Sequence, residues 1–128
     1  MLRVLIAAAV LAATVMPAVA GDPAAGEKAF VVCKACHKIG ESAKNAIGPV
    51  LNGVVGRQAG SIEGFNYSDA MKNSGITWDE ANLTEYIKNP KAKVPGNKMA
   101  YAGVKDDTKV ADIIAYLSQF AADGTKTQ

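Results

Sequence analysis

The five residues Cys33-Lys34-Ala35-Cys36-His37 constrain this 128-residue chain more than any other stretch. They contain both of its cysteines and its only histidine. Two thiols at this spacing, followed directly by a histidine, are typical of covalent haem attachment, in which the imidazole binds the iron. In a helical segment, positions 33, 36 and 37 share one face. The motif therefore predicts one covalently attached haem c, with Cys33 and Cys36 as thioether residues and His37 as an axial ligand of the iron.

Other uses of a Cys-x-x-Cys pair fit the chain less well. A structural zinc site takes four Cys or His ligands, and this chain has three in total. A thioredoxin-like dithiol is expected beside a strand in a βαβ unit, and no alternation of strands and helices is visible. A disulfide across two intervening residues would close a very small loop and stabilise little.

The first twenty residues have the pattern of a secretory signal. Arg3 is followed by the apolar run 4–15 and by a small-x-small cleavage site at 18–20. This run is shorter than the roughly 20 residues that a membrane span needs. We therefore expect residues 1–20 to be a cleaved signal peptide and residues 21–128 to form a single exported domain, periplasmic in a bacterium and without stable membrane insertion. An uncleaved amphiphilic anchor is the alternative.

Capping signals and apolar spacing predict short helices separated by irregular loops. We expect helices over about 23–33 after Asp22-Pro23, over 69–73, and from Thr77-Trp78-Asp79-Glu80 to Asn89-Pro90. Glycine-rich turns predict loops over 39–64, and Pro95-Gly96 indicates an extended loop over 91–103. The last helix, capped by Asp106 or Asp107 and ended by Asp123-Gly124, carries an apolar stripe: Val110, Ile113, Ile114, Leu117 and Ala121. The fold class is all-α.

A second axial ligand must come from outside the motif, because the chain has no other histidine. Beyond the expected signal peptide, the thioether candidates are Met71, in a short predicted helix, and Met99, in the extended loop. Met99 is favoured because an extended segment can cross the opposite haem face, whereas Met71 could simply fill a gap. Methionine opposite histidine raises the reduction potential and suits electron transfer.

Taken together, these residues resemble the class I c-type cytochromes, specifically the small group that holds mitochondrial cytochrome c and bacterial cytochrome c2. The likeness covers essentially all of residues 21–128. Besides the haem motif, it includes Gly26, Phe30, the segments 48–53, 56–57, 64–69 and 75–78, Tyr86, the segments 89–91 and 95–99, and Tyr116.

The resemblance implies a cytochrome c fold, in which short helices and irregular loops wrap one haem and the N- and C-terminal helices cross. It implies that Met99 is the sixth ligand and that the Pro49 carbonyl accepts a hydrogen bond from His37. It further implies that Arg57, Tyr67 and Trp78 surround the haem propionates and that Tyr86 faces the Met99 side. Three features depart from the family pattern. Asn97 stands where most relatives have a propionate-binding threonine, Met71 replaces an asparagine, and the spacer from Phe30 to Cys33 is one residue shorter than in the animal proteins.

The distribution of charge predicts the kind of partner. Residues 86–105 carry five lysines and no acid, whereas residues 58–85 carry five acids and one lysine. Such separation favours oriented encounters between proteins. We expect an electron carrier, not an enzyme, that is monomeric, binds no nucleic acid, and docks transiently on membrane redox complexes such as a cytochrome bc complex and a photosynthetic reaction centre or terminal oxidase. The expected docking lysines are Lys34, Lys38, Lys91, Lys98 and Lys105.

Two other functions remain open from the sequence. One is a peroxidase or gas-sensing haem protein with an open sixth coordination position, and the other is an exported redox or structural module without haem. A solvated lysine-rich loop is likewise the alternative to a docking face.

Overall fold

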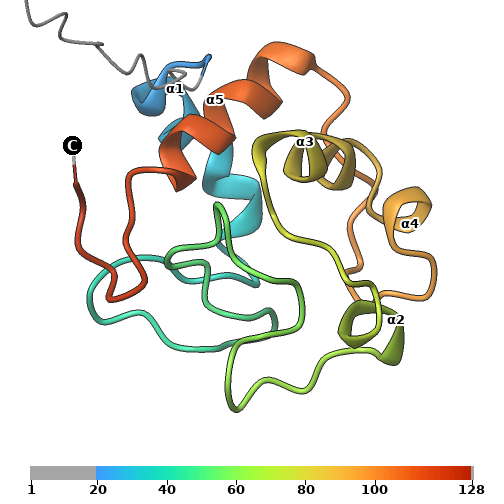
Figure 1. Ribbon diagram of the computed structural model, residues 1–128. Helices are drawn as coiled ribbons and strands as arrows, with labels where there is room; N and C mark the ends of the chain where they lie inside the picture. The colour runs from blue at the N-terminus through green and yellow to red at the C-terminus, as the bar shows by residue number, and fades with distance from the viewer. Residues whose placement is uncertain (1–19, 128) are drawn as a thin grey trace, which may run out of the picture.

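The computed structural model describes residues 20–127, so the predicted signal segment lies outside the described residues apart from Ala20. Figure 1 shows short helices joined by long loops. In chain order the elements are α1 (Pro23–Ala29), the 3₁₀ helix η1 (Phe30–Cys33), α2 (Asp69–Lys72), α3 (Glu80–Lys88), α4 (Pro90–Lys93) and α5 (Asp107–Leu117). Between residues 20 and 127 there is no strand, only the isolated bridges Gln58–Thr77 and Phe120–Lys126. The predicted all-α class is confirmed.

Aspartate side chains start the three longer helices. The carboxylate of Asp22 accepts a hydrogen bond from the Ala24 amide at 3.0 Å at the start of α1. Asp79 caps α3 and Asp106 caps α5 in the same way, at 2.8 and 3.0 Å. Each cap satisfies an amide that has no partner within its own helix.

The first and last helices cross, as predicted (Figure 1). Gly26 makes the close approach possible, because a Cβ atom there would lie 1.8 Å from the carbonyl oxygen of Asp112. One turn further on, the ring of Phe30 packs at 5.3 Å from that of Tyr116. The amide of Asp22 also donates to the Asp112 carboxylate at 2.8 Å, so this contact joins the start of α1 to α5.

The structure corrects the predicted elements at three points. Residues 30–33 form a 3₁₀ turn rather than a continuation of α1. Residues 90–93 form the short helix α4 rather than the start of the extended loop, because Pro90 ends α3 and also occupies the first position of a new helix. The last helix ends at Leu117, well before Asp123-Gly124, and Phe120 enters a bridge with Lys126 instead.

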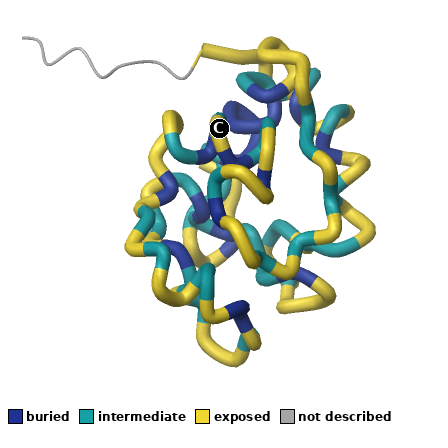
Figure 2. Tube along the Cα trace, turned by 90° about the vertical axis from the view of Figure 1, so that its right-hand side faces the viewer, coloured by how far each residue is buried: buried dark blue, intermediate teal, exposed yellow. Residues whose placement is uncertain are grey.

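The buried core lies where α5, α3 and η1 meet the loops. Val110, Ile113, Ile114 and Leu117 are each at most 4% exposed, which confirms most of the predicted stripe. Figure 2 shows buried residues in short stretches all along the trace rather than in one continuous element. The loop residue Asn52 is also buried, and its side chain bonds both the amide and the carbonyl of Gly40 at 2.8 Å. Polar side chains thus satisfy loop backbone that regular structure leaves unpaired.

None of the helices between residues 20 and 127 is long and apolar enough to cross a membrane.

Candidate haem-binding site

The Cys33–His37 segment forms a helical turn. The amides of Cys36 and His37 both donate to the carbonyl of Cys33, at 3.1 and 2.9 Å. This geometry confirms the expected spacing, in which the two thiols and the imidazole share one face. Both cysteines are free and half-buried. Burial, and next the neighbouring Cys36, raises the pKa of the Cys33 thiol.

The His37 ring is held from one side by the segment that follows it. Its Nδ1 lies 2.8 Å from the carbonyl oxygen of Pro49, and because a carbonyl only accepts, Nδ1 carries the proton. Gly48 lies against the ring, where a Cβ atom would stand 2.4 Å from Cε1. Burial lowers the pKa of His37, and the charge of Arg57 lowers it further, against the opposing effect of the Pro49 hydrogen bond. The neutral imidazole therefore has Nε2 free as a metal ligand.

One cavity of about 420 Å³ brings the predicted ligands together. It is lined by Cys33, Cys36 and His37, and also by Met99 from 62 residues further along the chain. Met71 of α2 lines it too. The other lining residues include a large apolar share: Leu51, Val54, Phe65, Leu83, Ile113 and Leu117. A large flat apolar group suits such walls.

The residues expected around the haem propionates also line this cavity. Arg57 uses Nη1 to donate to the carbonyls of Val50 and Asn52, both at 3.0 Å. Its Nε is buried, and across residues 20–127 it is the one buried side-chain nitrogen or oxygen without a hydrogen-bond partner. Trp78 is 5% exposed and packs against Tyr86, with 4.8 Å between ring centres and 46° between the ring planes. A buried, unused donor is what an ionised carboxylate requires, so the residues present fit a haem.

The remaining predicted site residues have definite partners. The hydroxyl of Tyr67 accepts a hydrogen bond from the Ile62 amide at 3.2 Å. The hydroxyl of Tyr86 donates to the Met99 sulfur at 3.8 Å. Burial raises the pKa of Tyr86 to about 12, so this phenol keeps its proton at neutral pH.

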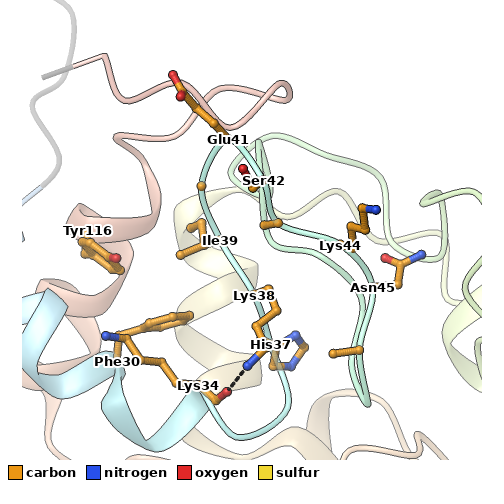
Figure 3. A pocket seen from close by; sticks show the side chains of 13 residues that line it. Phe30, Lys34, His37, Lys38, Ile39, Glu41, Ser42, Lys44, Asn45 and Tyr116 are labelled. Carbon is orange, nitrogen blue, oxygen red and sulfur yellow. Dashed lines mark hydrogen bonds between the residues drawn. The ribbon is translucent and has the colours of Figure 1, made fainter.

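A second, more open hollow of about 650 Å³ lies around the segment that follows the motif (Figure 3). Phe30, His37 and Tyr116 line it together with three lysines, Lys34, Lys38 and Lys44. It shares Phe30 and His37 with the cavity that gathers the predicted ligands, but it includes neither cysteine nor Met99. In the part of the chain that the structure describes, no group of three or more His, Cys, Asp or Glu side chains is arranged to hold a metal ion.

Two site residues carry roles that the sequence did not assign. Gly48 lies in the segment 39–64, which we predicted only as a loop, and its contact with His37 depends on how that loop folds. Asn97 makes three side-chain hydrogen bonds inside the Met99 loop. Its position next to Pro95-Gly96 was the available signal, since such turns are fixed by neighbouring side chains.

Comparisons with known proteins agree with this geometry. The cytochrome c family model matches residues 23–121. The chain is 63% identical over 117 residues to cytochrome c2 of Blastochloris viridis, covering 91% of this chain and 92% of that protein. It is 62% identical over 107 residues to cytochrome c-554 of Methylosinus trichosporium, covering 84% and 81%. Among solved structures, cytochrome cH from Methylobacterium extorquens matches with a TM-score of 0.73 at 56% identity, over 77% of this chain and 98% of that one.

The chain therefore belongs to the cytochrome c family, among the class I c-type cytochromes that are similar to bacterial cytochrome c2. It carries one covalently bound haem c, and it is an electron carrier rather than an enzyme.

Proposed function

We propose that the chain is a periplasmic one-electron carrier, exported by a cleaved signal peptide at residues 1–20, with residues 21–128 as its single domain. In this proposal it shuttles as a monomer between membrane redox complexes, such as a cytochrome bc complex and a photosynthetic reaction centre or terminal oxidase. The observation that carries the proposal is that one largely apolar cavity is lined by His37, both cysteines and Met99. A site closed by two protein ligands suits electron transfer rather than substrate chemistry.

The proposed assignments follow the geometry of the cavity. Cys33 and Cys36 form the thioethers, and His37 and Met99 are the axial ligands of the iron. The Pro49 carbonyl fixes the tautomer of His37 and strengthens its Nε2 as a ligand. When bound, the haem supplies a single electron through its Fe(III)/Fe(II) couple.

The polar residues around the cavity are proposed to stabilise the haem propionates and the Met99 sulfur. Arg57 has a buried, unpaired Nε–H that would be available to a haem propionate, and we place Tyr67 and Trp78 beside the same propionates. Tyr86 keeps its phenol proton and holds the Met99 sulfur. The apolar walls keep water from the iron, so little solvent needs to reorganise when the charge changes.

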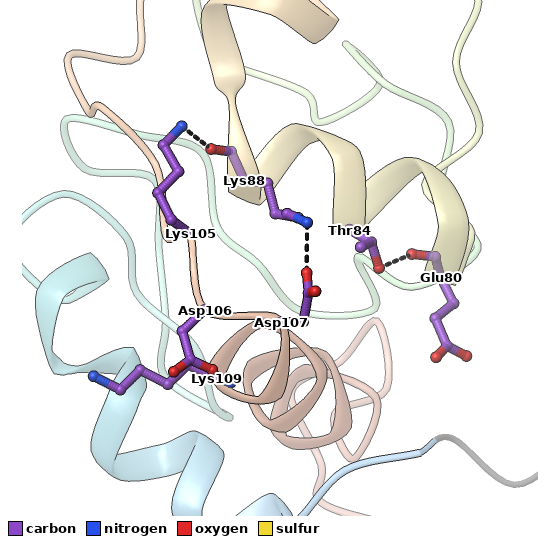
Figure 4. A network of polar contacts seen from close by, with 7 residues as sticks. All are labelled: Glu80, Thr84, Lys88, Lys105, Asp106, Asp107 and Lys109. Atoms are coloured by element: carbon purple, nitrogen blue, oxygen red, sulfur yellow. Dashed lines mark hydrogen bonds and ion pairs between the residues drawn. The ribbon is translucent and has the colours of Figure 1, made fainter.

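The five proposed docking lysines are all exposed. Within residues 20–127 the ion pairs are instead Lys88–Asp107 and Lys93–Glu85, which involve two other lysines of the same region. Figure 4 shows Lys88 facing Asp107, while the Lys105 ammonium donates to the carbonyl of Lys88. The basic groups outside these pairs are the ones we expect to meet acidic membrane complexes rather than nucleic acid.

Two exposed apolar side chains at the cavity are the proposed centre of the surface that the docking lysines surround. Val32 and Ile47 line the cavity and are nonetheless 54% and 78% exposed. An apolar centre with a charged rim supports transient docking that is fast to form and fast to release. We therefore place the docking face at the mouth of the cavity.

The test compares the matched variants Met99→Leu and Met71→Leu, which remove one sulfur each and nearly conserve volume. The oxidised wild-type protein should show a low-spin haem with the sulfur-to-iron charge-transfer band, and Met71→Leu should retain that band. Met99→Leu should lose it and bind carbon monoxide when reduced. A wild-type haem that is high-spin and binds carbon monoxide readily would indicate an open, ligand-binding site and contradict the proposal.

A further inference from the structure

The loop that carries Met99 has little regular structure of its own. Between the end of α4 and the start of α5 the chain forms turns and irregular backbone. An axial ligand on such a loop needs other contacts to hold it in place, because irregular backbone has few internal hydrogen bonds. The side chain of Asn97 supplies three of these contacts.

Asn97 uses both ends of its amide. The amide nitrogen donates to the carbonyl of Pro90 at 2.9 Å and to the carbonyl of Val94 at 2.8 Å. The amide oxygen accepts from the backbone amide of Met99 at 2.8 Å. A single side chain therefore links the backbone of Met99 to the backbone of α4 and the turn that follows it.

The two donors of this amide are fully used. A primary amide has two N–H groups, and each has a backbone carbonyl as its partner here. Asn97 has no donor left for a haem carboxylate, which is the role implied for a threonine at this position. The departure from the family pattern thus replaces a bond to the haem with bonds inside the loop.

The other end of this link is itself fixed. Pro90 is buried, and the Asn89 side chain caps α4 by accepting from the Ala92 amide at 3.2 Å. The ion pair between Lys93 and Glu85 ties α4 to α3. Past Met99, the Val104 amide donates to the Ile87 carbonyl at 2.9 Å, so α3 also anchors the far end of the loop.

We propose that Asn97 is a positioning residue that keeps Met99 at the iron by fastening the backbone of Met99 to α4. This inference rests on the proposed assignment of Met99 as the axial ligand. An external ligand can bind the iron only when Met99 moves away. With Asn97 in place that movement breaks the hydrogen bond from the Met99 amide to the Asn97 side chain, which the bonds to Pro90 and Val94 hold in position. Loss of Asn97 should therefore make Met99 easier to displace, without removing the sulfur itself.

The experiment is an imidazole titration of the oxidised holoprotein, in which binding is measured as the loss of the sulfur-to-iron band. Asn97→Ala removes all three bonds and should raise the affinity for imidazole at least about tenfold, which corresponds to 1.4 kcal/mol. Asn97→Thr keeps one donor and should give a smaller increase. It also supplies the comparison if Asn97→Ala fails to accumulate as holoprotein. Asn82→Ala is the control, because Asn82 likewise donates to a backbone carbonyl, that of Thr77, but lies outside the Met99 loop.

Different outcomes would contradict the assignment of Met99 as a ligand and the positioning role of Asn97. A wild-type protein without the sulfur-to-iron band would overturn the ligand assignment itself. The role of Asn97 alone would be overturned if the wild-type protein shows the band and both Asn97 variants bind imidazole within twofold of the wild-type affinity. Denaturant unfolding, monitored by Trp78 fluorescence, distinguishes a general structural role of Asn97 from a role in holding Met99. Lower global stability with unchanged imidazole affinity would also contradict the inference.

Discussion

Gly48 occupies a position where the His37 ring leaves no space for a side chain. A Cβ atom at Gly48 would lie 2.4 Å from Cε1 and 2.7 Å from Nδ1 of the ring. We predict that Gly48→Ala pushes the imidazole away from the Pro49 carbonyl and lowers the free energy of unfolding by about 1–3 kcal/mol, the usual cost of overpacking. The measurement is the proton resonance of His37 Nδ1–H, which should shift or disappear.

Gly75→Ala is the control for that variant. Gly75 has a φ of +67° and nothing within 4 Å of the added Cβ, so alanine there costs backbone strain without a steric clash. The His37 resonance should stay in place in this variant even though stability falls. An unchanged resonance in Gly48→Ala would show that the loop gives way instead of the ring.

At the crossing of α1 and α5, one tyrosine is expected to make the free energy of unfolding depend on pH in the alkaline range. Burial, and next the charge of Glu27, raises the pKa of Tyr116, which packs on Phe30 at this crossing. The unfolded tyrosine titrates near pH 10. Stability from the neutral phenol is therefore fully present below about pH 10 and is lost as pH rises toward the folded pKa.

We predict that Tyr116→Phe removes this part of the pH dependence. Denaturant unfolding of the reduced protein at pH 9 and pH 11 should show a larger loss for wild type than for the variant. Between pH 7 and pH 8.5 the difference between the two proteins should stay constant. Equal losses from pH 9 to pH 11 would mean that another group controls alkaline unfolding.

The elements that the sequence predicts well are those with local signals. Asp22, Asp79 and Asp106 each precede a helix and each caps it, because capping depends on the three or four residues that follow. The apolar spacing of α5 likewise reports directly which residues are buried. Its predicted end was wrong because the bridge between Phe120 and Lys126 ends the helical path before Gly124 is reached.

The site is predictable where its residues have distinctive chemistry. The prediction of Cys33, Cys36 and His37 rests on one motif, and the prediction of Met99 rests on the scarcity of other ligands together with the likeness to known cytochromes. The contact of Gly48 with His37 could not be predicted, and the only signal for the three bonds of Asn97 was its position next to Pro95-Gly96. They depend on how loops fold over one another, and neither residue type by itself indicates such a role.

At the scale of the whole molecule, the charge distribution predicts how the protein meets its partners. Lys98 is exposed and lines the cavity, whereas Lys126 lies in the C-terminal segment, which Figure 1 shows on the opposite side from α4. At low ionic strength we predict that Lys98→Glu slows reduction by the anionic reagent ferrocyanide about 3- to 10-fold, since steering by a whole charged surface is worth about 10- to 1000-fold. Added salt should reduce the difference.

Lys126→Glu changes the net charge by the same amount and serves as the control. Its rate should stay close to that of wild type if the electron passes through the face that includes Lys98. The sulfur-to-iron band must be intact in both variants, so that the rates report charge alone. Equal slowing by the two substitutions would show that net charge, and not a docking face, governs the encounter.

The pairing of α1 with α5 also sets an order of events in time. A chain that emerges from its N-terminus presents Cys33–His37 about seventy residues before Asp107, where α5 begins. Until α5 arrives, the cavity lacks the wall formed by Ile113 and Leu117, and Gly26 has no helix to pack against. In the folded protein the thiols are half-buried, so we expect haem attachment to be easier before the last helix has packed than after it.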